Sequence, residues 1–441
     1  MDELLYAGRG AIDAAQERYF AEMIGLAATR HRHTRALLAR EKLSAKDVSS
    51  LADLPKLPVT RKEDYMRDPE AFLLDGEGLP DEMRAVWDVM YTTGSTAGKP
   101  TPFVSTTYDF FRILETNRNM LRLRGAREDD IIANLFPVTP RPHGAFIRAL
   151  HAAASMNLRA VAALPGNPSP YFTLGNELDR VVEVVAHSRA SILWGVPGYV
   201  RRVVARAQAV GADLSSVRLA CLTGEGVPEA ARDELTAMLR AVGKADAWVS
   251  ISYGATELQG GMVECAPGSG YHNPAPDQFH LQLVDPQTLA PVEDGEPGLV
   301  LLTHLRRRGT VLLRYALGDI STLTRERCPH CGAATDRLIA MPRRVDRLLK
   351  VKGTLLNPDV LVRAAEAVLG SRQYQYAISD GEILGLNVAG AADAALAAKL
   401  SEAVKRACDV TPVVAFVGEE AIGDPARAWK TKRVIDQRRP M

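Results

Sequence analysis

A loop of small and hydroxylated residues is the first segment whose composition suggests chemistry. The run YTTGSTAGKPT spans residues 91–101 and contains Gly94, Gly98 and Lys99. In such a loop, backbone N–H groups can converge on phosphate oxygens, and the hydroxyl and lysine side chains add further donors. A Walker A loop needs four residues between the glycines and a Ser or Thr after the lysine. Here three residues separate the glycines and Pro100 follows Lys99, so we expect a phosphate site of another kind, with an ordinary surface turn as the alternative.

Cysteine and histidine spacing indicates a metal site. Cys328 and Cys331 form a C-x-x-C, and Cys265 and His272 lie earlier in the chain with six residues between them. Together they make a Cys₃His set, which is typical of closed structural zinc sites. A redox pair is the alternative interpretation of the C-x-x-C, although the sequence around it lacks the strand-to-helix context of thioredoxin-like motifs. Two further histidines are alternative nitrogen ligands: His330 and His280.

The elements that position these residues alternate between strands and helices over the middle of the chain. Short apolar runs predict strands at 131–136, 191–196, 217–222 and 248–253. Helical spacing of apolar side chains predicts helices at 177–189, at 198–210 and directly after Pro228. This alternation indicates a mostly parallel sheet with helices on its faces.

The two ends of the chain differ from this middle part. The N-terminal segment looks helical, and Thr60 is expected to cap the helix that follows Pro58. The runs FHLQLVD, GLVLLTHL and TVLLRYALGDIS predict strands joined by short turns, which make a β-rich subdomain over 279–340. We therefore expect an N-terminal domain over 1–345 and a separate α+β C-terminal domain over 346–441.

Composition and charge narrow the function classes. The 441 residues are 46% apolar and 24% charged, which are values of globular proteins. Lys plus Arg is 54 and Asp plus Glu is 53, so the net charge of +1 gives no reason to expect nucleic acid or an anionic membrane as a partner. We find neither a run of about 18 apolar residues nor a basic segment followed by an apolar core at the N-terminus. With five cysteines the chain is no disulfide scaffold, and we expect it in the cytoplasm.

Six segments, taken in order, resemble the core motifs of the adenylate-forming superfamily of acyl-CoA ligases, adenylation domains and luciferases. They are YTTGSTAGKPT (91–101), TGEGVPE (223–229), SYGATE (252–257), YALGDIS (315–321), RRVDRLLKVKG (343–353) and AWKTKRVID (428–436). The segments LPKLPVTRKED and ECAPGSGYHNPAPDQFHLQLVDPQTL are similar to the phenylacetate–CoA ligase-like branch, in which zinc ligands recur in this region. The resemblance implies an α/β fold with a large N-terminal domain and a small mobile C-terminal domain.

The resemblance also implies a reaction in two steps. A carboxylate attacks the α-phosphorus of ATP to give an acyl-adenylate and pyrophosphate, and the thiol of coenzyme A then displaces AMP to give a thioester. Because both steps move negative charge, catalysis would depend on cations and aligned hydrogen-bond donors. The cofactors implied are ATP, Mg²⁺, coenzyme A and structural Zn²⁺.

Each residue that matches a motif has an expected role. The β- and γ-phosphates would bind to Thr92, Thr93, Gly94, Ser95, Thr96 and Gly98. Adenine and the acyl group would lie against Gly224, Glu225, Gly226, Ser252, Tyr253, Gly254 and Ala255. Thr256 would contact the α-phosphate, Glu257 would hold Mg²⁺, and Asp319 would accept hydrogen bonds from both ribose hydroxyls.

Further expected roles concern the C-terminal motifs and the acyl pocket. Lys430 would offset the developing charge of the α-phosphate, with Lys432 as its rival, and Arg344 would contact the nucleotide. Asp346 would be the hinge of the C-terminal domain, and Gly353 would face the site after rotation. A flat aromatic acid would occupy a pocket formed by Phe136, His143, Phe146 and Gly254.

Three functions follow from these expectations. The favoured one is an aryl-acid–CoA ligase, with a homodimer as a possible assembly. The second has the same adenylation chemistry but passes the acyl group to an acyl carrier protein or to an amine. The third is a non-catalytic nucleotide- or zinc-binding partner protein, and the presence of Glu257, Asp319 and Lys430 argues against it.

Overall fold

The computed structural model describes residues 2–91, 101–138, 144–166, 174–224, 226–344, 349–351, 354–356, 358–370, 372–422 and 433–438. The chain divides into two compact units. Unit 1 consists of Met1–Asn134, Thr139–Val161 and Ser250–Val345, and unit 2 of Leu135–Val138, Ala162–Val249 and Asp346–Met441. The domain boundary predicted between residues 345 and 346 stays a prediction.

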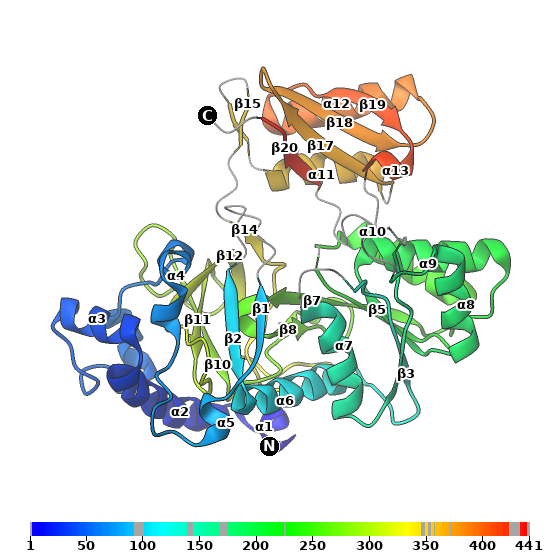
Figure 1. Cartoon of the computed structure of the whole chain (residues 1–441). Helices are drawn as coiled ribbons and strands as arrows, with labels where there is room; N and C mark the ends of the chain where they lie inside the picture. The colour runs from blue at the N-terminus through cyan, green and yellow to red at the C-terminus, as the bar shows by residue number, and fades with distance from the viewer. Residues whose placement is uncertain are drawn as a thin grey trace. The chain divides into compact units, whose positions relative to one another are not determined.

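Helices form the N-terminal part of unit 1, as its sequence indicates. They are α1 (Asp2–Tyr6), α2 (Arg9–Arg30), α3 (Arg32–Glu41), α4 (Lys62–Arg67), α5 (Asp81–Arg84), α6 (Thr107–Leu123) and α7 (Gly144–Ser155), with 3-10 turns at Leu51–Lys56 and Pro69–Phe72. A third 3-10 turn, Thr256–Leu258, lies later in the unit, directly after β7 (Trp248–Ala255). Apolar side chains of α2 and α3, among them Phe20 and Leu38, share a core with Leu305 and Val311. Figure 1 accordingly shows α2 and α3 beside the strands of the same unit.

The expected role of Thr60 as a helix cap is wrong. The helix α4 begins at Lys62 and its N-cap residue is Arg61. The Thr60 hydroxyl instead donates to the Leu313 carbonyl oxygen over 3.1 Å, and its amide donates to the carbonyl of Arg314. Thr60 therefore ties the chain to the start of a strand rather than to the helix after it.

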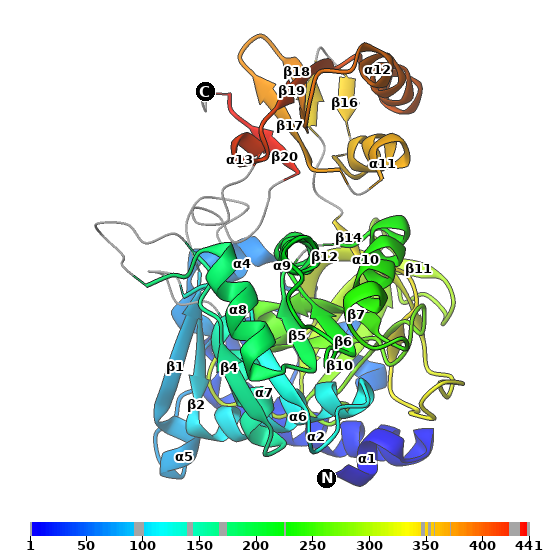
Figure 2. The ribbon, with the colours of Figure 1, turned by 90° about the vertical axis from the view of Figure 1, so that its right-hand side faces the viewer.

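An antiparallel sheet forms the rest of unit 1. Its strands follow the order β10 (Phe279–Val284), β11 (Pro297–His304), β12 (Tyr315–Thr324), β13 (Arg337–Leu338), β9 (Tyr271–His272), β8 (Gly260–Val263) and β7 (Trp248–Ala255), and β14 (Arg343–Arg344) pairs with β12. Four further strands are β1 (Val86–Tyr91), which pairs with β2 (Pro102–Thr106), and β3 (Ile131–Asn134) and β4 (Arg159–Ala162). Figure 2 shows the β1–β2 hairpin with α5 at its end.

The predicted β-rich segment differs from the structure at one place. The run TVLLRYALGDIS is a strand only from Tyr315 onward. The amides before it bond elsewhere: that of Val311 to the Phe72 carbonyl, that of Leu312 to the His304 ring and that of Arg314 to the Thr303 hydroxyl. These bonds take the donors that a longer β-ladder would need.

Unit 2 contains the parallel strands and helices that the middle of the sequence predicts. Strands β5 (Ile192–Gly195) and β6 (Leu219–Leu222) pair in parallel, and helices α8 (Leu178–Ser188), α9 (Pro197–Val210) and α10 (Glu229–Val242) pack in sequence order. Every residue of both strands is buried. Such fully buried strands are typical of parallel sheets covered by helices.

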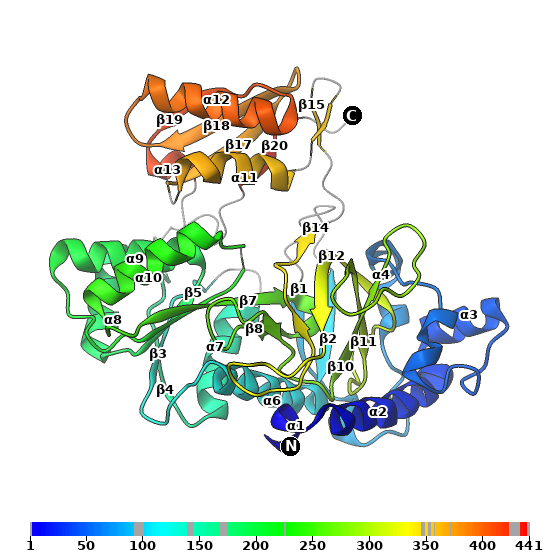
Figure 3. The ribbon, with the colours of Figure 1, turned by 180° about the vertical axis from the view of Figure 1, so that it is seen from behind.

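The C-terminal part of unit 2 has a hydrophobic core of its own. It contains the strands β15 (Leu349–Val351), β16 (Thr354–Leu356), β17 (Tyr374–Ser379), β18 (Ile383–Ala389), β19 (Val413–Val417) and β20 (Val434–Asp436), and the helices α11 (Pro358–Leu369), α12 (Ala394–Cys408) and α13 (Glu419–Ile422). Four strands form a sheet in the order β19-β18-β17-β20. Figure 3 shows α11 and α12 on the same face of this sheet, and side chains such as Leu361, Tyr376 and Leu400 fill the space between them.

Candidate functional site

Several residues with an expected role lie outside the described part of the chain. They are Thr92, Thr93, Gly94, Ser95, Thr96, Gly98, His143, Glu225, Asp346, Gly353 and Lys430. The rival lysine, Lys432, lies outside it as well. The expectations for these residues therefore stay predictions, and the geometry below concerns the other members of the set.

The end of β7 carries the SYGATE motif in unit 1. Ser252, Tyr253, Gly254 and Ala255 belong to the strand, and the 3-10 turn Thr256–Leu258 follows it directly. The Tyr315 hydroxyl donates to Oε1 of Glu257 over 3.2 Å. Burial and the neighbouring Glu257 carboxylate raise the pKa of Tyr315 above its ordinary value, so this hydroxyl keeps its proton and acts as a donor. Glu257 thus presents a carboxylate, the kind of oxygen ligand that Mg²⁺ prefers, and a tyrosine fixes one of its oxygens.

Asp319 lies on β12, close to the same motif. Its side chain is buried, with 6% of the residue exposed, and the Tyr253 hydroxyl donates to its Oδ2 over 2.7 Å. The Nε of Arg344 lies 3.3 Å from the other oxygen, Oδ1, and Nη1 of Arg344 donates to the Leu317 carbonyl. A Cβ on Gly318 would lie 2.8 Å from Nη1 of Arg344, so the glycine allows the arginine to approach. The structure therefore brings together Tyr253, Asp319 and Arg344.

The electrostatics around Tyr253 keep its hydroxyl protonated. Burial is the main cause, and the Asp319 carboxylate is the second, of a pKa raised well above the ordinary value of a tyrosine. A protonated phenol is the form that donates to a carboxylate. The two carboxylates in this region, Asp319 and Glu257, each accept a hydrogen bond from a tyrosine hydroxyl.

The glycines of the TGEG segment lie in unit 2. Gly224 follows β6 and has a φ of +99°, a conformation that L side chains rarely adopt. The amide of Thr223 donates to the Gly195 carbonyl at the end of β5. Both segments therefore leave the carboxyl ends of parallel strands, where open α/β sheets bind ligands. Gly226 belongs to the loop that leads to α10.

The two aromatic residues expected in the acyl pocket differ in exposure. Phe136 is completely buried, whereas Phe146, on α7, is partly exposed. The amide of the Asn134 side chain donates to the Phe146 carbonyl over 2.9 Å and so connects α7 to the end of β3. The assignment of both rings to an acyl pocket stays a prediction.

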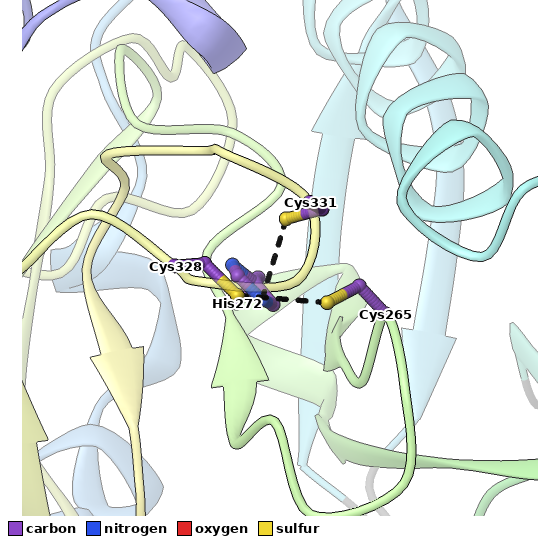
Figure 4. A group of neighbouring side chains, drawn as sticks. All are labelled: Cys265, His272, Cys328 and Cys331. Atoms are coloured by element: carbon purple, nitrogen blue, oxygen red, sulfur yellow. Dashed lines mark hydrogen bonds between the residues drawn. The ribbon is translucent and has the colours of Figure 1, made fainter.

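Four cysteine and histidine side chains converge in unit 1, as Figure 4 shows. They come from the segment after β8 (Cys265), from β9 (His272) and from the loop between β12 and β13 (Cys328 and Cys331). Their ligand atoms all lie within 4.8 Å of one another. The Sγ atoms of Cys265 and Cys328 are 3.7 Å apart, and Sγ of Cys331 lies 3.8 Å from Nε2 of His272. In a tetrahedral site with Zn–S bonds of about 2.3 Å, neighbouring sulfurs are about 3.8 Å apart, so the donor set and its spacing fit a zinc ion.

The alternatives to this ligand set do not have the same geometry. All five cysteines are free thiols. His280, on β10, donates a hydrogen bond from Nδ1 to Oε1 of Gln16 over 3.0 Å. Within the described residues neither His280 nor His330 belongs to the cysteine cluster. His272 is therefore the nitrogen ligand that the fold supplies.

Two side chains that bond to the SYGATE segment were not singled out from the sequence. Gln259 and His304 both contact the Thr256–Leu258 turn, through the carbonyl oxygens of Thr256 and Glu257 respectively. Gln259 lies two residues after the SYGATE motif, so its proximity to the turn was available from the sequence. His304 ends the apolar strand β11, and a single histidine in such a run has no spacing that indicates a partner.

Comparisons with known proteins agree with this geometry. The sequence profile of the family described as "AMP-binding enzyme" matches residues 27–305. The phenylacetate-coenzyme A ligase of Thermus thermophilus is 26% identical over 371 residues, which are 83% of this chain and 77% of that protein. The phenylacetate-coenzyme A ligase of Escherichia coli is 25% identical over 320 residues, 71% of this chain and 67% of that protein.

A solved structure shows the same fold. The 2-hydroxyisobutyryl-CoA ligase, in the postadenylation state in complex with R3-HIB-AMP, aligns with a TM-score of 0.80 at 20% identity over 99% of this chain and 92% of that chain. In the described part of the present chain, no helix has the length and apolar character needed to cross a membrane.

The resemblance inferred from the six motifs is confirmed by these comparisons, including the phenylacetate–CoA ligase-like branch. The family profile extends over well more than half of the sequence. The chain therefore belongs to the AMP-binding enzyme family.

Proposed function

We propose that this protein activates a carboxylic acid with ATP to form an acyl-adenylate and pyrophosphate, and then transfers the acyl group to coenzyme A. The observation that carries this proposal is the pairing of two carboxylates with two tyrosines, Asp319 with Tyr253 and Glu257 with Tyr315. The family and the relatives named as CoA ligases support the same reaction. Because AMP leaves when the thiol of coenzyme A attacks the acyl-adenylate, the proposed enzyme is an AMP-forming acid–CoA ligase.

The described residues have distinct proposed roles in the first step. The Asp319 carboxylate accepts hydrogen bonds from the ribose, because its two oxygens match a vicinal diol. Glu257 holds Mg²⁺, which when bound would neutralise charge on the phosphates. The Thr256 hydroxyl contacts the α-phosphate, and Arg344 keeps the Asp319 side chain in place through its ion pair. The lysine that stabilises the transition state is proposed to be Lys430.

The proposed substrate is an aromatic acid. The relatives at 25–26% identity are named phenylacetate-coenzyme A ligases, and this is the support for an aromatic substrate. We therefore expect phenylacetate or a substituted benzoate to be a better substrate than a fatty acid. An acyl carrier protein or an amine as the acceptor, a homodimer and a cytoplasmic location stay predictions.

We also propose one structural zinc ion per chain, held by Cys265, His272, Cys328 and Cys331. The support is the mutual approach of the four ligand atoms within 4.8 Å. The ion would join the segment after β8 to the loop after β12, two segments that the chain separates by more than fifty residues. Closing such a gap with a metal removes conformational freedom from the unfolded chain.

The test is a screen of acid-dependent pyrophosphate release with phenylacetates, benzoates and fatty acids. Positive acids are then assayed for a thioester with free coenzyme A and for hydroxamate formation in its absence. A thioester supports the proposed function, and hydroxamate alone supports transfer to another acceptor. If neither the thioester nor the hydroxamate forms with any acid, the enzymatic function is overturned. Glu257→Gln and Asp319→Asn should abolish turnover, whereas Glu183→Gln, which changes an exposed carboxylate on α8, is the matched control.

A further inference from the structure

Two side chains of unit 1 bond directly to the 3-10 turn Thr256–Leu258: one from β11 and one from the residue that follows the turn. A third side chain, from α7, bonds to the second of these. His304, at the end of β11, contacts the Glu257 carbonyl oxygen, with Nε2 at 2.9 Å. Gln259 donates from Nε2 to the Thr256 carbonyl oxygen over 2.6 Å. Arg148, on α7, in turn donates from Nη2 to Oε1 of Gln259 over 2.7 Å. The contacts to Thr256 and Glu257 are made to backbone carbonyl oxygens, so they leave the side chains of these two residues free for the proposed reaction.

The contacts of His304 define its protonation state. The amide of Leu312 donates to Nδ1 over 3.0 Å, so Nδ1 has no proton. The Glu257 carbonyl can only accept, so Nε2 carries the proton and donates. Burial and the nearby Arg307 lower the pKa of His304 to about 3. The ring is therefore neutral and locked in one tautomer, with one donor aimed at the turn.

Gln259 holds the turn from its other end. Its backbone has a φ of +52°, a conformation that residues other than Gly, Asn and Asp rarely adopt. Its backbone amide and its side-chain amide both donate to the Thr256 carbonyl, and its oxygen accepts from Arg148 and, over 3.4 Å, from Ser105. Only 6% of the residue is exposed. A function that depends on the geometry of the turn would explain why a buried polar residue is kept in this strained conformation with all of these hydrogen bonds.

We propose that His304 and Gln259 are positioning residues that hold the carbonyl oxygens of Glu257 and Thr256 and thereby aim the side chains of these two residues at Mg²⁺-ATP. This inference rests on the proposed function, because it takes Glu257 as the Mg²⁺ ligand. A rigid turn presents carboxylate and hydroxyl with fixed directions before the nucleotide binds. Groups that orient a metal ligand in this way commonly change metal affinity by about 10–100-fold when they are removed.

The test uses variants of the whole chain. His304→Leu removes the donor, and His304→Gln restores a side chain that can donate to Glu257 and accept from Leu312. Gln259→Gly removes the side-chain hydrogen bond to the Thr256 carbonyl, and glycine adopts the positive φ without strain. The matched control is His280→Leu, on the adjacent strand β10, because its ring pairs with Gln16 and not with the turn.

Two measurements are made on each folded variant. The first is Mn²⁺ binding in the presence of a non-hydrolysable ATP analogue, followed by electron paramagnetic resonance. The second is the Mg²⁺ dependence of acid-dependent pyrophosphate exchange. We expect His304→Leu and Gln259→Gly to weaken Mn²⁺ binding and to raise the half-saturating Mg²⁺ concentration by about tenfold or more. We expect His304→Gln to stay within about threefold of the unaltered protein.

The outcomes are distinct. The positioning role is overturned if folded His304→Leu and Gln259→Gly bind Mn²⁺ like the unaltered protein, or if His280→Leu weakens binding as much as they do. Should His304→Leu fail to fold, Gln259→Gly decides alone. If the unaltered protein binds Mn²⁺ with the analogue but exchanges no pyrophosphate with any acid, the proposed function fails, while the Mn²⁺ comparison still decides the positioning role.

Discussion

The hydroxyl of Tyr253, on β7, donates a hydrogen bond to the carboxylate of Asp319, on β12, over 2.7 Å. The reverse contact lies next to it, since Tyr315 of β12 donates to Glu257, just after β7. Each segment therefore contributes one tyrosine and one carboxylate, four positions apart. The two hydrogen bonds tie the proposed ribose-binding and Mg²⁺-binding carboxylates into one rigid arrangement, so that movement of either segment would disturb both.

Removing one of these hydroxyls should separate the two roles. Tyr253→Phe keeps the ring but leaves Asp319 with one partner fewer, and a hydrogen bond to a charged group contributes about 1.5–3 kcal/mol. We expect AMP to bind about tenfold more weakly, as measured by titration calorimetry. Tyr315→Phe should instead raise the Mg²⁺ requirement and leave AMP binding nearly unchanged. If both variants lower AMP affinity equally, the division of roles between the two carboxylates is wrong.

The lysine of the last motif should act in the first step only. We expect Lys430→Ala to slow acyl-adenylate formation by at least about 100-fold, the scale of losing one electrostatic donor in the transition state. Thioester formation from a pre-made acyl-adenylate should largely survive, because that step would use a rotated C-terminal domain. Lys432→Ala is the control, and a loss of adenylation with it rather than with Lys430→Ala would shift the assignment by two residues.

The parts of the fold and site that could be predicted from the sequence are those that local patterns encode. Apolar spacing and short buried runs predicted the helices α8 and α9 and the strands β5 and β6. Motif order singled out Glu257 and Asp319, whose roles stay predictions. The C-x-x-C at Cys328 predicted the cysteine cluster, because one short turn supplies two of the four metal ligands and only two more are needed from elsewhere in the chain.

The remainder depends on contacts between distant segments. The Glu257–His304 hydrogen bond joins residues 47 positions apart, and the Arg148–Gln259 bond joins residues 111 positions apart. Neither has a period or spacing that a sequence pattern detects. For Thr60 the local pattern predicted a contact that does not form. Threonine is a good helix cap, but the Thr60 hydroxyl donates to the Leu313 carbonyl oxygen instead, so the tertiary contact overrides the local preference.

Acid should destabilise this protein through its buried histidines. Burial, reinforced by His33, lowers the pKa of His31 to about 4, below its value of about 6.5 in an unfolded chain. The unfolded state then binds a proton first, so stability is complete above about pH 6.5 and falls as the pH drops toward 4. His31 also accepts from the Thr34 amide at the start of α3, and Asn is a good replacement at such a cap. We expect His31→Asn to flatten the pH dependence of the urea midpoint between pH 7.5 and 5, and an unchanged slope would contradict the role of His31.

Metal removal should destabilise unit 1. We expect one zinc per chain by elemental analysis, and chelation or Cys331→Ser to release it and to lower the melting temperature by several degrees, because the loop between β12 and β13 loses its anchor. The matched control is Cys408→Ser, which changes a free, half-buried thiol on α12 outside the cluster. A preparation that is fully active and contains no zinc would remove this assignment.

The last prediction concerns the proposed hinge. Two half-reactions in one cleft need different residues over the adenylate, and rotation of the C-terminal domain about Asp346 would supply them. A hinge residue must absorb a large change in φ and ψ, and proline fixes φ near −65°. We expect Asp346→Pro to hold the domain in one state, so that pyrophosphate exchange persists if that state is the adenylating one while thioester formation is lost. Gly353→Leu should slow only the second half-reaction, because a side chain there would obstruct the pantetheine path. Both half-reactions are measured on each folded variant, and equal losses in the two would exclude a rotating-domain mechanism for this protein.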